Sequence, residues 1–83
     1  MSRLPKELEH TLIAWITRVG TDRYHSIREV FPGDSPSEHA HRRNCRLLVR
    51  KGLLEPDPSA GDAATIRRMS TDHLMSQRFR CTA

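Results

Sequence analysis

The sequence predicts a single α+β domain over residues 1–83, mainly α, with three helices, a two-stranded hairpin and a short C-terminal helix. Three observations support this fold class. Apolar residues near the N-terminus repeat at a helical period, two capping boxes mark the starts of two further helices, and the period changes after Gly52. A chain of 83 residues has room for one small core. We expect such a core to gain stability from self-association or from a partner.

The first helix is expected over residues 5–19. Pro5 suits the first helical position, and Gly20 is a typical C-terminal stop. Apolar residues between them share one helical face: Leu8, Leu12, Trp15, Ile16 and Val19. We interpret this face as the side that packs in the core, whereas Thr11 falls away from it.

A short second helix is expected over residues 27–31. Ser26 and Glu29 form the S-x-x-E pattern of a capping box at its start. The polar stretch 21–25 before it could be briefly extended, and Pro32-Gly33-Asp34 after it predicts a turn.

The third helix, over residues 36–51, has the strongest start signal in the chain. Ser35 can cap it, Pro36 takes the first helical position, and Glu38 completes a second capping box. Gly52 is the expected stop. A helix followed by a short helix, a tight turn and a longer helix is the order of a helix-turn-helix domain.

The chain after Gly52 predicts a hairpin over residues 53–69. Its first strand is expected at 53–55, and its return strand at 64–69, where Thr65 and Ile66 favour extended structure. The residues between them are rich in proline, glycine and aspartate and predict a loop.

The remaining segment, 71–83, is expected to begin as a short helix. Ser70 can cap this helix, which carries Leu74, Met75 and Phe79. Residues 80–83 are expected to be loose.

A family resemblance enters at the end of the third helix. The run Leu48-Val49-Arg50-Lys51-Gly52-Leu53-Leu54 resembles the L-x-x-K-G-L-[LI] pattern that ends the recognition helix of many winged helix-turn-helix regulators. The segment 53–69 resembles the β-wing of the MarR-like and related groups. The resemblance covers residues 8–75 and implies a winged helix-turn-helix fold whose third helix reads DNA. Wing tips of MarR-like proteins usually have an arginine, whereas this chain has Asp57 and Asp62 there.

A cationic stripe along the third helix is the main functional signal. On a helical wheel, one side has Ala40, Asn44, Leu47 and Leu48. The other side has one histidine and four arginines: His39, Arg42, Arg43, Arg46 and Arg50. Arginine matches phosphate oxygens and pairs bidentately with guanine in the major groove. The net charge of +4 is modest, so this clustering is the stronger indication of a polyanionic partner.

These residues predict a small transcriptional regulator that binds double-stranded DNA. The N-terminal part of the third helix, with Ser37, Arg42 and Arg43, is expected near the base edges. Arg46 and Arg50 are expected on backbone phosphates. Four further residues are candidates for phosphate contacts: Arg67, Arg68, Ser35 and Arg28. A homodimer is also expected, because two half-sites multiply specificity.

The sequence leaves other partners open. The acidic tip at Asp57 and Asp62 would suit a winged-helix module that binds protein, such as a small phage or plasmid protein that blocks a nucleic-acid-handling machine. RNA is a third candidate partner. Loss of the helix arginines would abolish nucleic-acid binding but leave a protein contact through the wing intact.

Neither an enzyme nor a cofactor or metal is predicted. The chain has no Gly-rich phosphate loop, no H-E-x-x-H and no nucleophile elbow. Candidate zinc ligands follow no finger spacing: His39, His41, Cys45, His73 and Cys81. Two cysteines outside any C-x-x-C motif and the lack of a long apolar run favour a cytoplasmic protein without membrane contact.

Overall fold

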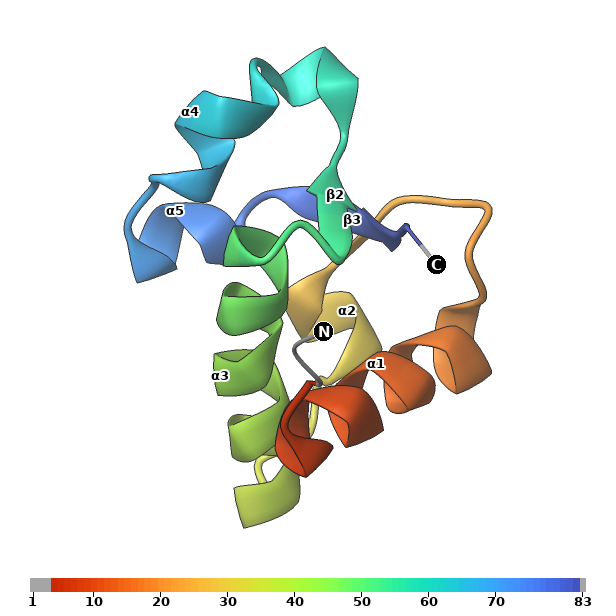
Figure 1. The fold of residues 1–83 in the computed structure, drawn as a ribbon. Helices are drawn as coiled ribbons and strands as arrows, with labels where there is room; N and C mark the ends of the chain where they lie inside the picture. The colour runs from red at the N-terminus through yellow and green to blue at the C-terminus, as the bar shows by residue number, and fades with distance from the viewer. Residues whose placement is uncertain (1–3, 83) are drawn as a thin grey trace.

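The computed structural model describes residues 4–82 and has an α+β, mainly helical fold with a small three-stranded antiparallel sheet (Figure 1). Its elements in chain order are α1 (Lys6–Val19), β1 (His25–Ser26), α2 (Ile27–Val30), α3 (Pro36–Arg50), β2 (Leu54–Pro56), the 3₁₀ helix η1 (Pro58–Ala60), α4 (Ala63–Arg67), α5 (Thr71–Met75) and β3 (Arg78–Cys81). The first three α-helices lie where the sequence places them. Within the described residues, no helix is both long and apolar enough to cross a membrane.

Side-chain caps begin α2 and α3. At α2, Ser26 Oγ accepts a hydrogen bond from the Glu29 N–H, and the Glu29 carboxylate accepts one from the Ser26 N–H, each at 3.2 Å. At α3, Ser35 Oγ accepts from the Glu38 N–H at 3.3 Å. The Glu38 carboxylate instead accepts from Arg18 of α1, so the second capping box is only half formed. A contact between helices has replaced a local one.

Gly52 ends α3 in a left-handed conformation, with φ of 81°. Its N–H donates to the Val49 carbonyl at 3.1 Å, and the Leu53 N–H donates to the Leu48 carbonyl at 2.9 Å. This pair of bonds is a Schellman motif, which satisfies carbonyl groups at the helix end and redirects the chain into β2.

The observed sheet differs from the predicted hairpin in its return strand. Residues 64–69, expected as the return strand, lie mostly in α4, whose cap is Asp62 accepting from the Thr65 N–H at 3.2 Å. The strand that returns along β2 is β3, in the tail expected to be helical and then loose. Its sequence alternates, with Phe79 and Cys81 buried, which is the period of a half-buried strand.

β3 is the central strand of the sheet, whose order is β1-β3-β2. Phe79 lies opposite His25 of β1 on one side and opposite Pro56 of β2 on the other. Arg80 lies opposite Glu55 and forms an ion pair with it. The C-terminal segment therefore joins two parts of the chain that are far apart in sequence.

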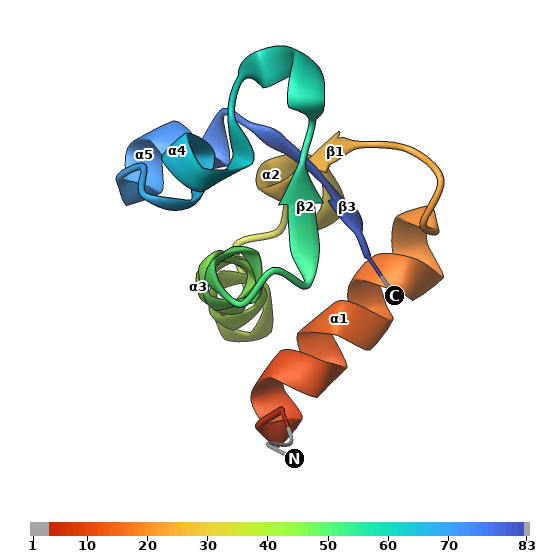
Figure 2. The same ribbon diagram turned by 45° about the horizontal axis from the view of Figure 1, so that its top comes forward.

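Residues 57–77 form an insertion between the two hairpin strands and contain η1, α4 and α5. Ile66 and Leu74 are fully or almost fully buried and anchor α4 and α5 on the core. Figure 1 places α5 beside the C-terminal end of α3 and α4 beyond α5, and Figure 2 shows α4 and α5 together on the same side of the molecule. The short helix predicted after Ser70 is present as α5, but Phe79 belongs to the strand that follows it.

The core lies where α1, α2, α3 and the sheet meet. Its buried apolar side chains are Leu8, Trp15, Ile27, Val30, Phe31, Cys45, Leu48, Val49, Leu54, Ile66, Leu74, Phe79 and Cys81. Two predictions for α1 are wrong: Thr11 is fully buried, whereas Ile16 is 37% exposed. Thr11 tolerates burial because its Oγ1 contacts His41 Nδ1 at 2.6 Å and accepts from Asn44 Nδ2 at 3.1 Å.

Candidate nucleic-acid interface

The buried face of α3 is rotated from the one that the helical wheel predicts. Arg42, Cys45, Leu48 and Val49 are buried, whereas Leu47 is 44% exposed. Leu47, Leu48 and Val49 are consecutive apolar residues, so the helix could bury either of two neighbouring faces. The helical wheel predicts the face that contains Leu47. The structure selects the face that buries Cys45 and Val49.

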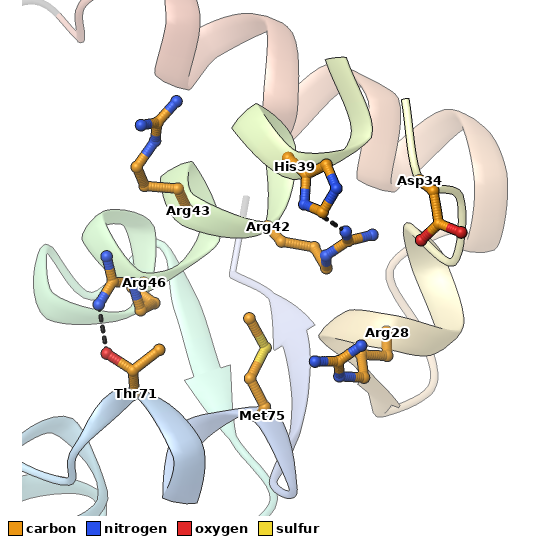
Figure 3. A pocket seen from close by; sticks show the side chains of 8 residues that line it. All are labelled: Arg28, Asp34, His39, Arg42, Arg43, Arg46, Thr71 and Met75. Atoms are coloured by element: carbon orange, nitrogen blue, oxygen red, sulfur yellow. Dashed lines mark hydrogen bonds between the residues drawn. The ribbon is translucent and has the colours of Figure 1, made fainter. Parts of the chain in front are cut away.

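Arg42 does not lie on the outward face, so its prediction as a base-contacting residue is corrected. Its side chain is 6% exposed, and its Nη1 donates to the Phe31 carbonyl and, at 2.7 Å, to the Gly33 carbonyl. Its Nη2 donates to His39 Nδ1 at 2.8 Å (Figure 3). The guanidinium thus satisfies carbonyl groups of the α2–α3 turn. Arg42 holds the turn in place and is not available to read bases.

The other arginines of the predicted stripe remain at the surface. Arg43 and Arg50 are exposed, and Arg46 is half-exposed with its Nη1 donating to Thr71 Oγ1 of α5. Ser37 and His39, near the N-terminus of α3, are exposed as well. The ion pairs within residues 4–82 are Arg18–Glu38, His25–Glu29 and Arg80–Glu55. None of them neutralises an arginine on the surface of α3.

Arg67 and Arg68 lie on or just after α4 and not on a strand. Both are exposed. A Cβ atom at Gly52 would lie 3.7 Å from Arg67 Nη2, which places this guanidinium beside the C-terminal end of α3. There it extends the cationic surface beyond Arg50 and Lys51.

A pocket of about 300 Å³ lies between α2, α3 and α5. Figure 3 shows arginines from two helices around it. Its charged lining residues are four arginines and one carboxylate: Arg28, Arg42, Arg43, Arg46 and Asp34. His39 of α3 also lines it, and two residues of α5, Thr71 and Met75, complete it. The sequence analysis missed both, because the capping signal at Ser70 predicts a helix without showing that it packs against α3.

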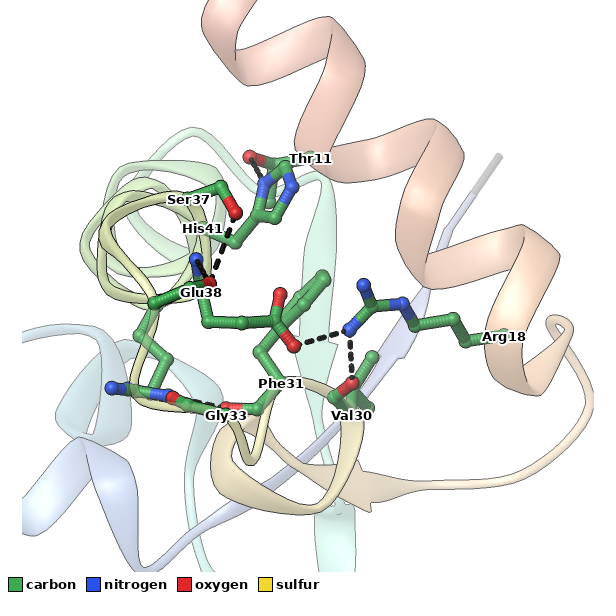
Figure 4. Close-up of polar contacts among 10 residues, drawn as sticks. Thr11, Arg18, Val30, Phe31, Gly33, Ser37, Glu38 and His41 are labelled. Atoms are coloured by element: carbon green, nitrogen blue, oxygen red, sulfur yellow. Dashed lines mark hydrogen bonds and ion pairs between the residues drawn. The ribbon is translucent and has the colours of Figure 1, made fainter.

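A polar and aromatic cluster holds α1 and α2 against the N-terminal half of α3 (Figure 4). Arg18 donates to Glu38 at 2.9 Å and to the Val30 carbonyl at 2.8 Å, and its guanidinium lies 4.8 Å from the Phe31 ring centroid. The Phe31 and His41 rings stack with centroids 4.8 Å apart. The Arg18 hydrogen bond lowers the pKa of the Glu38 carboxyl. These contacts fix the orientation in which α3 presents its exposed face.

His41 is expected to make the fold sensitive to mild acid. Burial lowers its pKa below 6.5, while Glu38 opposes this shift and Arg18 and His10 add to it. Between the lowered pKa of His41 in the folded chain and the value of 6.5 in the unfolded chain, the unfolded chain binds the proton more readily. The stabilising contribution is therefore complete above pH 6.5 and is lost as the pH falls through 6.5 towards the folded pKa.

Urea unfolding of the wild type and of His41→Gln at pH 7.5, 6.5 and 5.5 measures this contribution. The other histidines are the same in both proteins, so the difference between the two curves isolates His41. We expect the wild type to lose more stability on acidification than the variant does. Parallel pH profiles would show that His41 does not contribute.

Neither cysteine is placed for surface chemistry. Cys45 and Cys81 are buried and free, and burial raises the pKa of the Cys45 thiol. Among residues 4–82, no three histidine, cysteine, aspartate or glutamate side chains are grouped to hold a metal ion. The candidate zinc ligands of the sequence analysis are therefore not brought together.

Comparison with protein-family models, curated proteins and solved structures finds no match for this chain. The site predicted from the sequence is represented in the structure by the exposed side of α3. It has three surface arginines, with Arg28 of α2 and Arg67 of α4 next to it. None of these five arginines takes part in an ion pair within the described part of the chain.

Proposed function

We propose that the protein is a small regulator that binds double-stranded DNA through α3. The observation that carries this proposal is the surface row of Arg43, Arg46 and Arg50, none of which forms an ion pair within residues 4–82. Like charges on one helix face repel one another, and a polyanion relieves that repulsion. Arginine also has the geometry to bind phosphate and guanine.

The arrangement of the elements supports a winged helix-turn-helix. α2 and α3 form the two helices of the motif, and the pairing of β2 with β3 supplies the base of a wing. The side of α3 away from α1 lies at the edge of the molecule (Figures 1 and 2). An α-helix with its side chains is about 10–12 Å across, which matches a major groove about 12 Å wide.

The residues take different parts in this proposal. Arg43, with Ser37 and His39 near the start of α3, is the candidate for base edges and neighbouring phosphates. Arg46 and Arg50 are candidates for the backbone. Arg42 supports the α2–α3 turn from inside and contacts no DNA.

The two aspartates behind the alternative of a protein-binding wing have local roles in the fold. Asp57 and Asp62, which suggested an acidic tip, both serve as helix caps. Asp57 accepts from the Ser59 N–H at 3.0 Å, and this bond lowers the pKa of its carboxyl. Capping gives both aspartates a structural role, and the protein-binding alternative stays a prediction. Homodimerisation stays a prediction.

Binding to a random 20-base-pair duplex, followed by fluorescence anisotropy from 50 to 200 mM NaCl, tests the proposal. We expect the affinity to fall steeply with salt. The variant Arg43→Ala/Arg46→Ala/Arg50→Ala should bind at least about 100-fold more weakly at low salt, with a slope of log K against log salt reduced by about 2 to 3.

A matched variant removes the same charge elsewhere. Lys6→Ala/Arg23→Ala/Arg78→Ala changes three exposed cations outside α3. It should retain most of the affinity. Absence of salt-dependent binding by the wild type, or equal losses in the two variants, would rule out α3 as the DNA-binding element and turn attention to a protein partner.

A further inference from the structure

We propose that the pocket between α2, α3 and α5 is a phosphate site, which holds a backbone phosphate when α3 is on DNA. This inference rests on the DNA binding proposed above. It adds that α5, a helix inserted between the hairpin strands, forms one wall of the interface. We call Arg28, Arg43, Arg46 and Thr71 the phosphate clamp.

The charge of the pocket favours a small anion. Arg28 approaches from α2 and Arg46 from α3, whereas Arg43 lines the pocket from α3 with its guanidinium pointing away from Arg28 and Thr71 (Figure 3). Asp34 is the one acidic residue in the lining, and no clamp arginine forms an ion pair with it. The volume of about 300 Å³ compares with about 30 Å³ per molecule in liquid water, so a phosphate fits with several waters.

Thr71 supplies a neutral donor opposite the arginines. Its Oγ1 accepts a hydrogen bond from Arg46 Nη1, which leaves the hydroxyl proton free to donate elsewhere. The Thr71 side chain is exposed and lines the pocket. A hydroxyl beside a guanidinium is a common combination in contacts with DNA phosphates.

His39 is a further polar group in the lining of the pocket. Arg42 Nη2 donates to His39 Nδ1 at 2.8 Å, because a guanidinium has no acceptor. The buried Arg42 therefore holds the His39 ring in place beside the clamp.

The insertion explains why the site exists in this chain. A two-stranded wing with a simple loop would leave the side of α3 open, whereas α4 and α5 bring Thr71 into contact with Arg46. A phosphate at this point would be held from α2, α3 and α5 together. In this proposal α5 takes the role of a wing tip. Its contact with the phosphate is the Thr71 hydroxyl in place of an arginine.

Two NMR titrations of the full chain test the inference. One adds inorganic phosphate to ¹⁵N-labelled protein against chloride at equal ionic strength, and the other adds a 20-base-pair duplex. We expect phosphate to shift the signals of Arg28, Arg46 and Thr71. Arg28→Ala and Thr71→Val should each weaken phosphate binding at least about threefold, and should weaken duplex binding by about 3- to 10-fold. Arg23→Ala is the matched control, since this exposed arginine lies in the loop after α1.

The outcomes separate the inference from the proposed function. Shifts of the clamp by both phosphate and duplex, reduced in both variants with an intact spectrum, support the inference. A duplex that shifts α3 but leaves the clamp unchanged overturns the inference while DNA binding stands. Phosphate binding at the clamp without any duplex binding overturns both the proposed DNA binding and the inference that the clamp holds a DNA backbone phosphate. The ligand of the clamp would then be free phosphate or a phosphorylated small molecule. No response to either ligand overturns both proposals.

Discussion

Replacing Arg42 with alanine should destabilise the fold by about 2–4 kcal/mol, more than any other arginine substitution on α3. The side chain is almost completely buried and donates to the carbonyls of Phe31 and Gly33 and to the His39 ring. Alanine leaves these acceptors without their donor where water has little access. Small domains are only marginally stable, so such a loss is a large fraction of the total.

Thermal and urea unfolding of Arg42→Ala beside Arg43→Ala measures this effect. Arg43 is the next residue along the helix and is exposed, so its replacement should change stability by no more than about 0.5 kcal/mol. DNA binding should show the reverse order when both variants are folded at low temperature. Arg43→Ala should lose affinity, whereas Arg42→Ala should keep most of it. A stable Arg42→Ala protein that has lost DNA affinity would restore Arg42 as a reader of DNA and contradict the buried role.

Local signals explain why the helices were predictable. Ser26 and Ser35 each cap the helix that follows by accepting from the N3 backbone, and Gly52 ends α3 with a positive φ. These are contacts between residues close in sequence. The pattern around them is therefore sufficient to place α2 and α3.

The sheet depends on contacts that no local pattern contains. Thr65 and Ile66 favour a strand by residue type, yet Asp62 caps a helix there, and burial of Ile66 stabilises it. β3 has only four residues. Within it, Arg80 pairs with Glu55, which lies 25 positions earlier in the chain. A strand this short gives a weak periodic signal beside the strong capping signal at Ser70.

The candidate site was predictable in part for the same reason. The outward arginines Arg43, Arg46 and Arg50 follow from helical spacing alone. The burial of Arg42 does not, because a charged residue enters the interior only when particular carbonyls are placed to receive it. Thr71 could not be assigned to the site either, since its position depends on how the insertion folds back onto α3.

Ending the chain at Gln77 should prevent it from folding. The deletion removes β3, the central strand, and with it the hydrogen-bonded partner of both β1 and β2. Phe79 is fully buried, and Phe79→Ala alone should cost about 3–5 kcal/mol. Circular dichroism and the dispersion of an ¹H–¹⁵N spectrum would report the loss. Arg78→Ala, an exposed change in the same strand, should stay within about 0.5 kcal/mol of the wild type.

The truncation also tests how the sheet supports the interface. β2 begins directly after the Schellman motif that ends α3, and β3 holds β2 against the core through the Leu54–Cys81 and Pro56–Phe79 pairs. Without β3, neither the end of α3 nor the insertion with α5 keeps its position. DNA affinity and phosphate binding should therefore disappear together with the folded spectrum. A truncated chain that stays folded and binds the duplex would mean that the C-terminal residues are dispensable. In that case α1, α2 and α3 would form the binding unit without the sheet.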